Sequence, residues 1–235
     1  MQKKLKAMYY YFSTGEKLLW CISVLLIVVS FIIFDRGNYL VLAASLIGVT
    51  SLIYDAKGNP AGQVLMVMFS MLYGVISYKF AYYGEMATYL GMTAPMSVFA
   101  LVSWLRNPHN GNKAEVEIAR LKKAEIFNMV VLAVIVTVVF YFILRAFNTS
   151  NLVSSTASVT TSFLAVYMTY KRSTFFALAY AANDIILIVL WTLAALSDIS
   201  YIPVITCFVL FLINDIYTFI NWTRMHKRQE ISQTV

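Results

Sequence analysis

The amino-acid sequence predicts an all-α integral membrane protein with eight transmembrane helices. Hydrophobic residues make up 60% of the 235 residues, charged residues only 12%, and the mean hydropathy is +0.73. These values lie outside the range of soluble globular domains. The apolar residues form eight separate runs of about the length that crosses a bilayer as a helix. The Lys and Arg residues lie mainly between these runs and at the termini, and most of them fall in the segments on one side of the membrane.

The first expected element is an amphipathic segment over residues 1–17, whose four lysines and aromatic cluster suit the cytoplasmic headgroup region. The apolar runs then cover residues 18–34, 39–54, 60–79, 86–106, 126–147, 151–170, 174–196 and 201–222. Pro60 suits the first turn of its helix, whereas Pro95 falls inside the fourth helix and should kink it. We expect a short helix in the second half of the polar loop 107–123, and a basic cytoplasmic tail over 223–235.

The distribution of basic residues predicts the orientation of the helices. With eight crossings, only Arg36, Lys79 and Arg145 of the 18 Lys and Arg residues fall on one side of the membrane. Short cytoplasmic loops carry an excess of Lys and Arg, so both termini should be cytoplasmic. Removing any helix from this set would break the alternation.

An internal repeat relates the fourth helix to the eighth. FALVSWLR (99–106) and YTFINWTR (217–224) share Trp-x-Arg, and Tyr83 matches Tyr201 at the same offset of 118 residues. Four crossings separate the equivalent helices, so the repeats should be parallel. Residues 1–235 would then form one transmembrane domain in a 3+1+3 arrangement. Its parts are the extra helix 18–34, the first three-helix repeat 39–106, the cytoplasmic loop and linker helix 107–147, and the second repeat 151–222.

Several classes of function are disfavoured by the residues present. The sequence has no phosphate-binding GxxxxGK[ST] loop, and its histidines, His109 and His226, have no further metal ligands near them in the sequence. The basic residues follow the membrane topology rather than forming a nucleic-acid surface. Asp184 and Asp215 are expected at different depths, which argues against an intramembrane hydrolase. We therefore expect neither an enzyme nor a cofactor, metal or nucleic acid.

Polar residues inside the last two helices indicate where function lies. Asn183, Asp184, Asn214 and Asp215 interrupt two otherwise apolar runs, and Asp184 is near the middle of its run. Placing a carboxylate at membrane depth costs about 2.5–3.5 kcal/mol even on insertion scales, so such residues usually face a bundle interior and handle a substrate, an ion or a proton. We therefore expect a polar pocket on these helices.

Further candidate residues share helix faces with these groups or face them from the first repeat. Amides, a carboxylate and aromatic rings together suit a nucleoside-like solute, since rings stack on rings while Asn and Asp fix ring edges and hydroxyls. The tryptophans are interpreted first as interfacial anchors, and the hydroxyls of residues 154–162 as packing residues or a path. The candidate substrate-binding residues are Tyr73, Trp104, Tyr180, Asn183, Asp184, Trp191, Asn214, Asp215, Tyr217 and Asn221.

The contacts are expected to be asymmetric between the two repeats. At the 118-residue offset, Met96, Ser97 and Ser103 occupy the positions that match Asn214, Asp215 and Asn221. The first repeat thus lacks the amide and acid groups of the second. The pocket should lie nearer the seventh and eighth helices.

The motifs ND-x5-LW (183–191) and FLIND-x-Y-x-FINW-x-RM (211–225), with YGVISY, YYGEM and SWLRNP in the first half, resemble the PnuC family of bacterial nicotinamide riboside and vitamin-precursor transporters. The resemblance covers residues 38–228. It implies a SWEET-like architecture, a homotrimer in the bacterial cytoplasmic membrane, and facilitated diffusion of an unphosphorylated solute. A cytoplasmic kinase would then trap the product.

One motif departs from the family pattern W-x-x-W-x-x-x-[ND]. Asp184 fills its last position, but Ala177 and Tyr180 stand where the tryptophans would be. Nicotinamide riboside is the family default, and a deoxynucleoside, thiamine or riboflavin are alternatives within the same family. Proton coupling through Asp184 or Asp215 and a structural or assembly role without transport also remain open.

Overall fold

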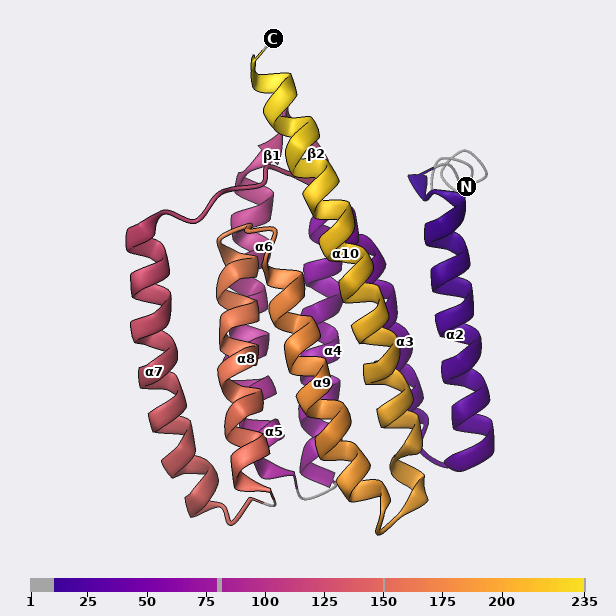
Figure 1. The fold of residues 1–235 in the computed structure, drawn as a ribbon. Helices are drawn as coiled ribbons and strands as arrows, with labels where there is room; N and C mark the ends of the chain where they lie inside the picture. The colour runs from indigo at the N-terminus through magenta and orange to yellow at the C-terminus, as the bar shows by residue number, and fades with distance from the viewer. Residues whose placement is uncertain (1–10, 80–81, 150, 235) are drawn as a thin grey trace.

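The computed structural model describes residues 11–79, 82–149 and 151–234. Long helices lie side by side, and the start of α2 and the end of α10 lie at the same end of the bundle (Figure 1). A short hairpin, β1 (Pro108–His109) and β2 (Asn112–Val116), lies at that end too. The helical elements are α2 (Thr14–Phe34), α3 (Tyr39–Ala56), α4 (Pro60–Lys79), α5 (Tyr83–Thr88), η1 (Tyr89–Thr93), α6 (Ala94–Arg106), α7 (Lys123–Ala146), α8 (Leu152–Tyr170), α9 (Phe176–Ala195), η2 (Ile199–Tyr201) and α10 (Ile202–Thr234).

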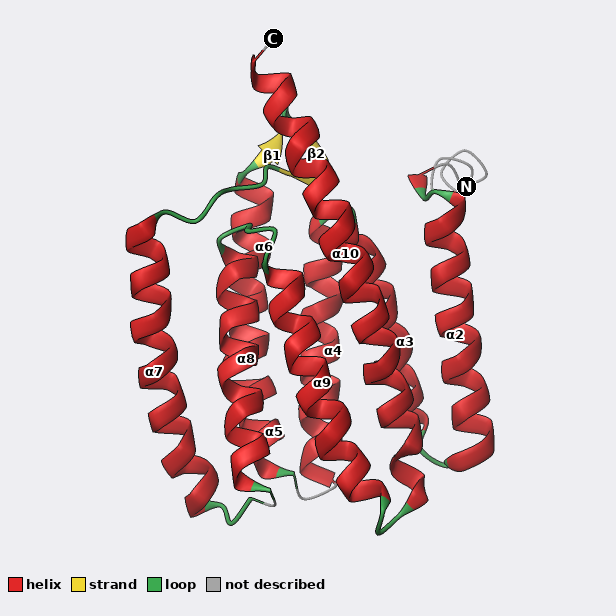
Figure 2. Ribbon diagram, in the orientation of Figure 1, coloured by secondary structure: helices red, strands yellow, loops and turns green. Residues whose placement is uncertain are grey.

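The all-helical fold class predicted from the sequence is confirmed (Figure 2). Among the described residues, seven helical stretches are long and apolar enough to cross a membrane, with Tyr83–Arg106 counted as one. The eighth predicted helix, α8, is missing from these seven because its many Ser and Thr side chains lower its hydropathy. It nevertheless lies inside the bundle between α7 and α9 (Figure 1).

Six helical segments form two layers that position the site. In Figure 1, α8, α9 and α10 lie in front, and α3, α4 and α5–α6 lie behind them. The layers meet where α3 packs on α10 and where α6 packs on α8. The linker helix α7 lies at the left edge against α8, and the additional helix α2 lies at the right edge against α3 and α10.

The first described helix begins four residues before the predicted start at residue 18, because a capping box fixes its N-terminus. Ser13 Oγ accepts a hydrogen bond from the backbone N–H of Glu16, and the Glu16 carboxylate accepts one from the N–H of Ser13. Residues 1–10 of the predicted amphipathic segment lie outside the described residues.

The predicted short helix in the loop 107–123 is wrong. Residues 117–122 in the second half of the loop have no regular secondary structure. Residues Pro108–Val116 form the hairpin, because Asn110 and Gly111 both adopt positive φ (48° and 77°) in a two-residue turn, as Asn-Gly favours. The backbone after the hairpin then bonds to other parts of the chain. The N–H of Val116 donates to the Gly58 carbonyl, and that of Ala119 donates to the Arg172 carbonyl.

Pro95 lies inside the continuous helical stretch Tyr83–Arg106, as predicted, and the π-helical turn η1 just before it interrupts the regular α-helix there. One further element differs from its predicted boundaries. The predicted tail 223–235 continues α10 as far as Thr234. Gln229 on this extension accepts a hydrogen bond from the N–H of Ile118 and donates one to the carbonyl of Val116.

Three of the four tryptophans are core residues, so the interfacial interpretation is wrong for them. Trp104, Trp191 and Trp222 are 0% exposed, whereas Trp20 is 37% exposed. The Trp104 and Trp222 rings pack at 5.3 Å between centroids. Their indole N–H groups donate to the backbone carbonyls of Thr169 and Asp55, respectively, which explains how these polar rings are buried.

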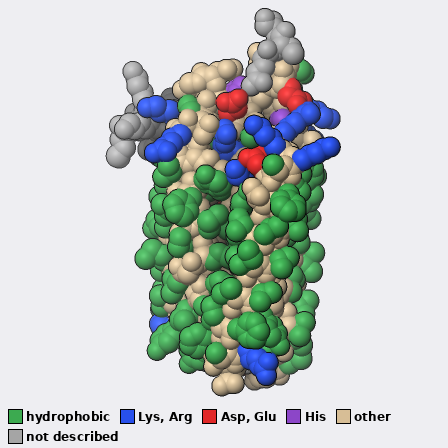
Figure 3. All heavy atoms as spheres, turned by 90° about the vertical axis from the view of Figure 1, so that its left-hand side faces the viewer, with side chains coloured by type: hydrophobic (Ala, Val, Ile, Leu, Met, Phe, Trp, Pro, Cys, Tyr) green, Lys and Arg blue, Asp and Glu red, His purple; other side chains and the backbone are tan. Residues whose placement is uncertain are grey.

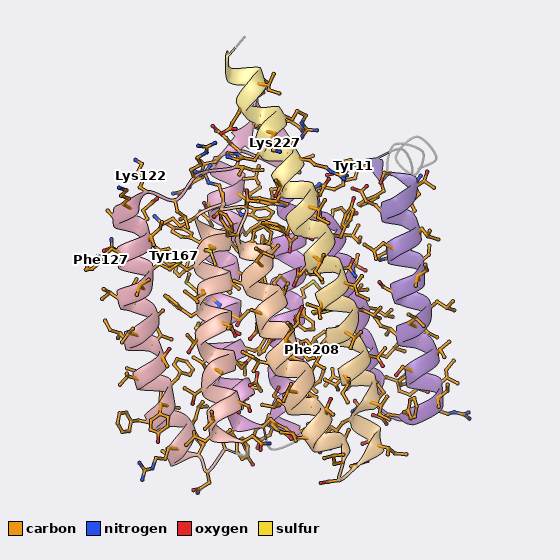
Figure 4. All side chains as sticks on the ribbon, viewed as in Figure 1. Tyr11, Lys122, Phe127, Tyr167, Phe208 and Lys227 are labelled. Atoms are coloured by element: carbon orange, nitrogen blue, oxygen red, sulfur yellow. The ribbon has the colours of Figure 1, made fainter. Side chains whose placement is uncertain are left out.

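The outer surface of the bundle is apolar. On the face shown in Figure 3, hydrophobic side chains cover the middle, and Lys and Arg gather mainly toward one end. Phe127 on α7 is 69% exposed and points away from the other helices (Figure 4). Lys122 and Lys227 both lie near the end that carries the hairpin (Figure 4). This distribution is that of a bilayer-spanning surface with one strongly basic end.

Candidate solute-binding site

A small cavity lies between the two layers of helices. Its volume is about 20 Å³, which is room for one water molecule. Side chains from α3, α4, η1, α8, α9 and α10 contribute to it, so both layers share the site. The lining residues are Leu52, Met66, Phe69, Tyr89, Thr93, Ser162, Tyr180, Asn183, Asp184, Phe211 and Asp215.

Two carboxyl groups meet at the wall of this cavity. Asp184 on α9 and Asp215 on α10 are 3% and 1% exposed, and their side chains are hydrogen-bonded to each other. The expectation that they lie at different depths is therefore wrong, because α9 and α10 bring them to the same level. Asp184 Oδ2 and Asp215 Oδ1 have no partner in the part of the chain that the structure describes, so each carboxyl keeps one oxygen for a ligand or water.

The amide of Asn183 is held by hydroxyl groups of α8. Its Oδ1 accepts hydrogen bonds from Thr161 at 2.9 Å, from Ser162 at 3.0 Å and from Ser158 at 3.4 Å. Some hydroxyls of α8 also bond to their own helix, as Thr156 and Thr160 do to carbonyls four residues earlier. The serine and threonine cluster of α8 thus fixes a cavity residue as well as packing the helix.

Aromatic rings and a lone hydroxyl complete the wall. Phe69 lies 5.2 Å from Phe211 and 6.0 Å from Tyr89, measured between ring centroids, and Tyr180 contributes a fourth ring. Thr93 Oγ1 is buried and has no hydrogen-bond partner within residues 11–79, 82–149 and 151–234. The lining therefore combines ring faces with unpaired polar atoms, the two features needed to hold a polar heterocyclic solute.

Three predicted site residues of α10 face away from the cavity. Asn214 donates to Ser23 Oγ and to the Leu210 carbonyl, and the Tyr217 hydroxyl donates to Glu16. Asn221 donates to the carbonyl of Ala56. The face that carries these residues packs on α2 and α3, where it joins helices.

Three aromatic candidates also lie in the core rather than at the cavity. The Trp191 indole N–H donates to the Tyr73 hydroxyl, in a cluster that includes Phe208. Trp104 packs on Trp222 and Phe176. Of the ten predicted residues, the cavity lining contains Tyr180, Asn183, Asp184 and Asp215.

Several buried polar residues were missed in the sequence. Glu85 is 1% exposed and lies 3.4 Å from Ser158 Oγ, and Asp55 is 2% exposed and accepts a hydrogen bond from Gln63. Their signal was available, because each carboxylate directly adjoins a predicted apolar run and belongs to the same helical stretch as that run. Thr93 gave no such signal, since a threonine in a membrane helix is common and its burial depends on packing.

A helical bundle with a membrane-facing surface and a small cavity that both layers line with aromatic and polar side chains has the architecture of a solute transporter. Residues 38–224 match the family model described as nicotinamide mononucleotide transporter. The chain therefore belongs to this family, in agreement with the PnuC motifs, and is a membrane transporter rather than an enzyme.

Individual relatives agree with this assignment. The chain is 26% identical over 220 residues to the nicotinamide riboside transporter PnuC of Neisseria mucosa, covering 92% of this chain and 83% of that protein. A crystal structure of the vitamin B3 transporter PnuC has the same fold, with a TM-score of 0.80 and 23% identity, covering 93% of this chain and 94% of that one.

Proposed function

We propose that this protein carries an unphosphorylated, nucleoside-like solute across the bacterial cytoplasmic membrane by facilitated diffusion, with nicotinamide riboside as the first candidate. The observation that carries the proposal is the cavity between the layers, where buried carboxyl and hydroxyl atoms lack protein partners beside four aromatic rings. The name of the Neisseria mucosa relative supports the choice of solute. A cytoplasmic kinase would trap the solute after entry.

The charge of the cavity favours a solute without phosphate. Two carboxyl groups line it, and no Lys, Arg or His is among its lining residues in the described part of the chain. A phosphate group in a low-dielectric site needs cationic or N–H partners, so a mononucleotide fits poorly. Nicotinamide riboside carries a positive pyridinium ring, which a carboxylate attracts.

The alternative solutes differ in charge and ring size. Thiamine shares a positive ring with nicotinamide riboside, whereas deoxynucleosides and riboflavin have no fixed positive charge. Of the two positions that depart from the family motif, Tyr180 lines the cavity and retains an aromatic face. Ala177 is 0% exposed and belongs to the core cluster around Trp104 and Trp222, so its small side chain does not bear on the cavity wall.

The transport cycle requires the cavity to widen. Pockets that bind drug-sized ligands measure about 300–1,000 Å³, against about 20 Å³ here. The π-helical turn η1 supplies two lining residues, Tyr89 and Thr93, and π-helical turns occur frequently at functional sites. We propose that rearrangement around η1 admits the solute.

We propose that the two layers are parallel repeats of a SWEET-like core, with all eight helices, including α8, crossing the membrane. The contacts between layers support this, because α3 with α10 and α8 with α6 are equivalent pairs under the repeat. The Trp222 indole N–H donates to the α3 carbonyl of Asp55, and the Trp104 indole N–H donates to the α8 carbonyl of Thr169. Exchange of the two repeats converts one contact into the other.

The turns that follow the first helix of each proposed repeat, between α3 and α4 and between α8 and α9, have matching hydrogen bonds, which also supports the repeat. The N–H of Gly58 donates to the Asp55 carbonyl and that of Arg172 to the Thr169 carbonyl. Both Gly58 and Arg172 have positive φ, at 65° and 58°. A cross-linking test with paired cysteines at equivalent contacts would contradict the repeat if only one of the two pairs formed.

The orientation and assembly follow from charge and surface. We propose that the basic end with the hairpin is cytoplasmic, which puts both termini inside. A reporter fused to the C-terminus that is found outside the cell would contradict this orientation.

We also propose a homotrimer, supported by the family resemblance and by the broad apolar surface of α7, where Val134 is 58% exposed. Native mass spectrometry that finds only monomers in lipid would exclude it.

Binding measurements on the purified protein test the proposed function. We expect nicotinamide riboside to raise the melting temperature in a concentration-dependent way, and nicotinamide mononucleotide, its phosphorylated counterpart, to have no effect at the same concentration. The panel should include thymidine, deoxyadenosine, thiamine and riboflavin. A shift from one of these alone would reassign the solute, and no shift from any of them would favour a structural or assembly protein.

A further inference from the structure

Among the described residues, the pair of carboxyl groups in the cavity has no cationic partner. Asp184 and Asp215 are hydrogen-bonded to each other, and the titratable groups that face them from the surrounding helices are Asp55 on α3, Tyr89 on η1, Tyr180 on α9 and Cys207 on α10. The described lining residues of α4 and α8, Met66, Phe69 and Ser162, carry no titratable group. Nothing in this set can neutralise two adjacent negative charges.

Two bare carboxylates in contact are unstable in such an environment. Their repulsion grows as the dielectric constant falls, and carboxyl pairs that share a buried site hold one proton between them. A hydrogen bond between two carboxyl oxygens itself requires a proton, because a carboxylate is an acceptor only. The geometry therefore calls for one proton at this pair.

A second observation shows that the pair faces a ligand site. Thr93 Oγ1, on a residue that is 2% exposed, lines the same cavity without a protein partner. Together with Asp184 Oδ2 and Asp215 Oδ1, it offers a ligand three polar atoms that the protein itself leaves unpaired. Buried polar atoms of native proteins almost always have a hydrogen-bond partner, so we expect a ligand or a water molecule to bind these three atoms.

We propose that Asp184 and Asp215 hold a single proton between their facing oxygens, and that the one remaining negative charge selects a monocationic solute over neutral and anionic ones. The proton stays with the pair throughout transport, so that no net proton crosses the membrane. The selectivity part of this inference rests on the proposed function, whereas the proton site does not.

Infrared spectroscopy of the ligand-free protein tests the proton site alone. A protonated carboxyl group has a C=O stretching band that a carboxylate lacks. We expect Asp184→Asn and Asp215→Asn each to lose the same band, and the double variant to lose nothing more. In either single variant the Asn side-chain amide donates the hydrogen bond in place of the carboxyl proton, and the remaining carboxyl group is ionised. Asp35→Asn, in the turn after α2, is the control and should lose no such band.

The alternative protonation states give different spectra. Two protonated groups would lose different bands in the two single variants, and two ionised groups would lose none. Either result overturns the proposal. The comparison needs only the two single variants, so it remains decisive if the double variant does not fold.

Ligand binding tests the selectivity. The probes are nicotinamide riboside and its reduced dihydro form, which has nearly the same shape without the positive charge. We expect the parent protein to prefer the cation by about 10- to 150-fold, the range for hydrogen bonds that involve a charged group. The single Asn variants keep the charge and should keep this preference within about threefold, whereas the double variant should lose it.

The outcomes separate the two claims. If a single Asn variant removes the preference, or the double variant retains it, the single-charge assignment is wrong. If neither probe binds the parent protein, the proposed solute is wrong, while the infrared bands still decide whether the pair holds a proton.

Discussion

Replacing Trp222 with alanine is expected to lower the free energy of unfolding by about 3–5 kcal/mol, the cost of truncating a buried Trp in a protein core. The Trp222 ring is 0% exposed, packs on Trp104 and Phe176, and donates to the Asp55 carbonyl. The van der Waals energy that is lost with these packing contacts does not depend on water around the protein, so much of this cost should also apply in a bilayer.

Thermal and denaturant unfolding in lipid nanodiscs measure this effect. The matched control is Trp20→Ala, because Trp20 is 37% exposed and lies on the additional helix α2, from which its indole donates to Thr50 of α3. A Trp222→Ala variant as stable as Trp20→Ala would contradict the central role of the tryptophan pair. Trp222→Phe should recover most of the packing but not the hydrogen bond.

The second large effect is expected on binding. Asn183→Ala should weaken the affinity for nicotinamide riboside by about 5- to 150-fold, which corresponds to about 1–3 kcal/mol for a buried hydrogen-bonding group. Part of the loss is indirect, because three hydroxyls of α8 donate to the same Asn183 oxygen and would lose their acceptor.

Asn214→Ala is the matched control for this prediction. It removes the same amide from an equally buried position on a neighbouring helix, but Asn214 contacts Ser23 and the Leu210 carbonyl rather than the cavity. We expect its affinity to stay within about threefold of the parent. Isothermal titration on samples with normal melting curves makes the comparison. A loss of affinity in Asn214→Ala but not in Asn183→Ala would place the site on the other face of α10.

The helices themselves were predictable because membrane spans are read from local composition. Runs of apolar residues and the placement of Lys and Arg located every long helix of the bundle. Most of the predicted helix ends lie within a few residues of the observed ends. The errors fall where another signal overrides hydropathy. The Asn110-Gly111 turn made a hairpin in a loop where only a short helix was expected, and the Ser13 to Glu16 capping box started α2 early.

The candidate site was predictable only in part, because neighbouring residues on a helix point in directions about 100° apart. Asn214 and Asp215 are adjacent in sequence, yet Asp215 lines the cavity and Asn214 faces α2. Which of the two meets the solute depends on how α10 packs between α2, α3 and α9. Such packing involves residues far apart in the chain, and no local pattern reports it.

The tryptophans illustrate the same limit. Interfacial position along a helix is visible in the sequence, and it suggested that Trp104, Trp191 and Trp222 anchor in the headgroup region. Their burial depends on carbonyl partners from other elements, such as Thr169 and Asp55. The proposed repeat relates these two contacts, but the sequence predicted neither of them.

Uptake of labelled nicotinamide riboside into proteoliposomes tests the transport proposal most directly. We expect uptake to be saturable and to stop when the inside and outside concentrations are equal. An imposed pH gradient should not accelerate it. At low solute concentration, Asn183→Ala should reduce uptake and Asn214→Ala should not. Accumulation above the outside concentration, driven by an inward proton gradient, would contradict facilitated diffusion. The absence of uptake by protein that binds the solute would contradict transport itself.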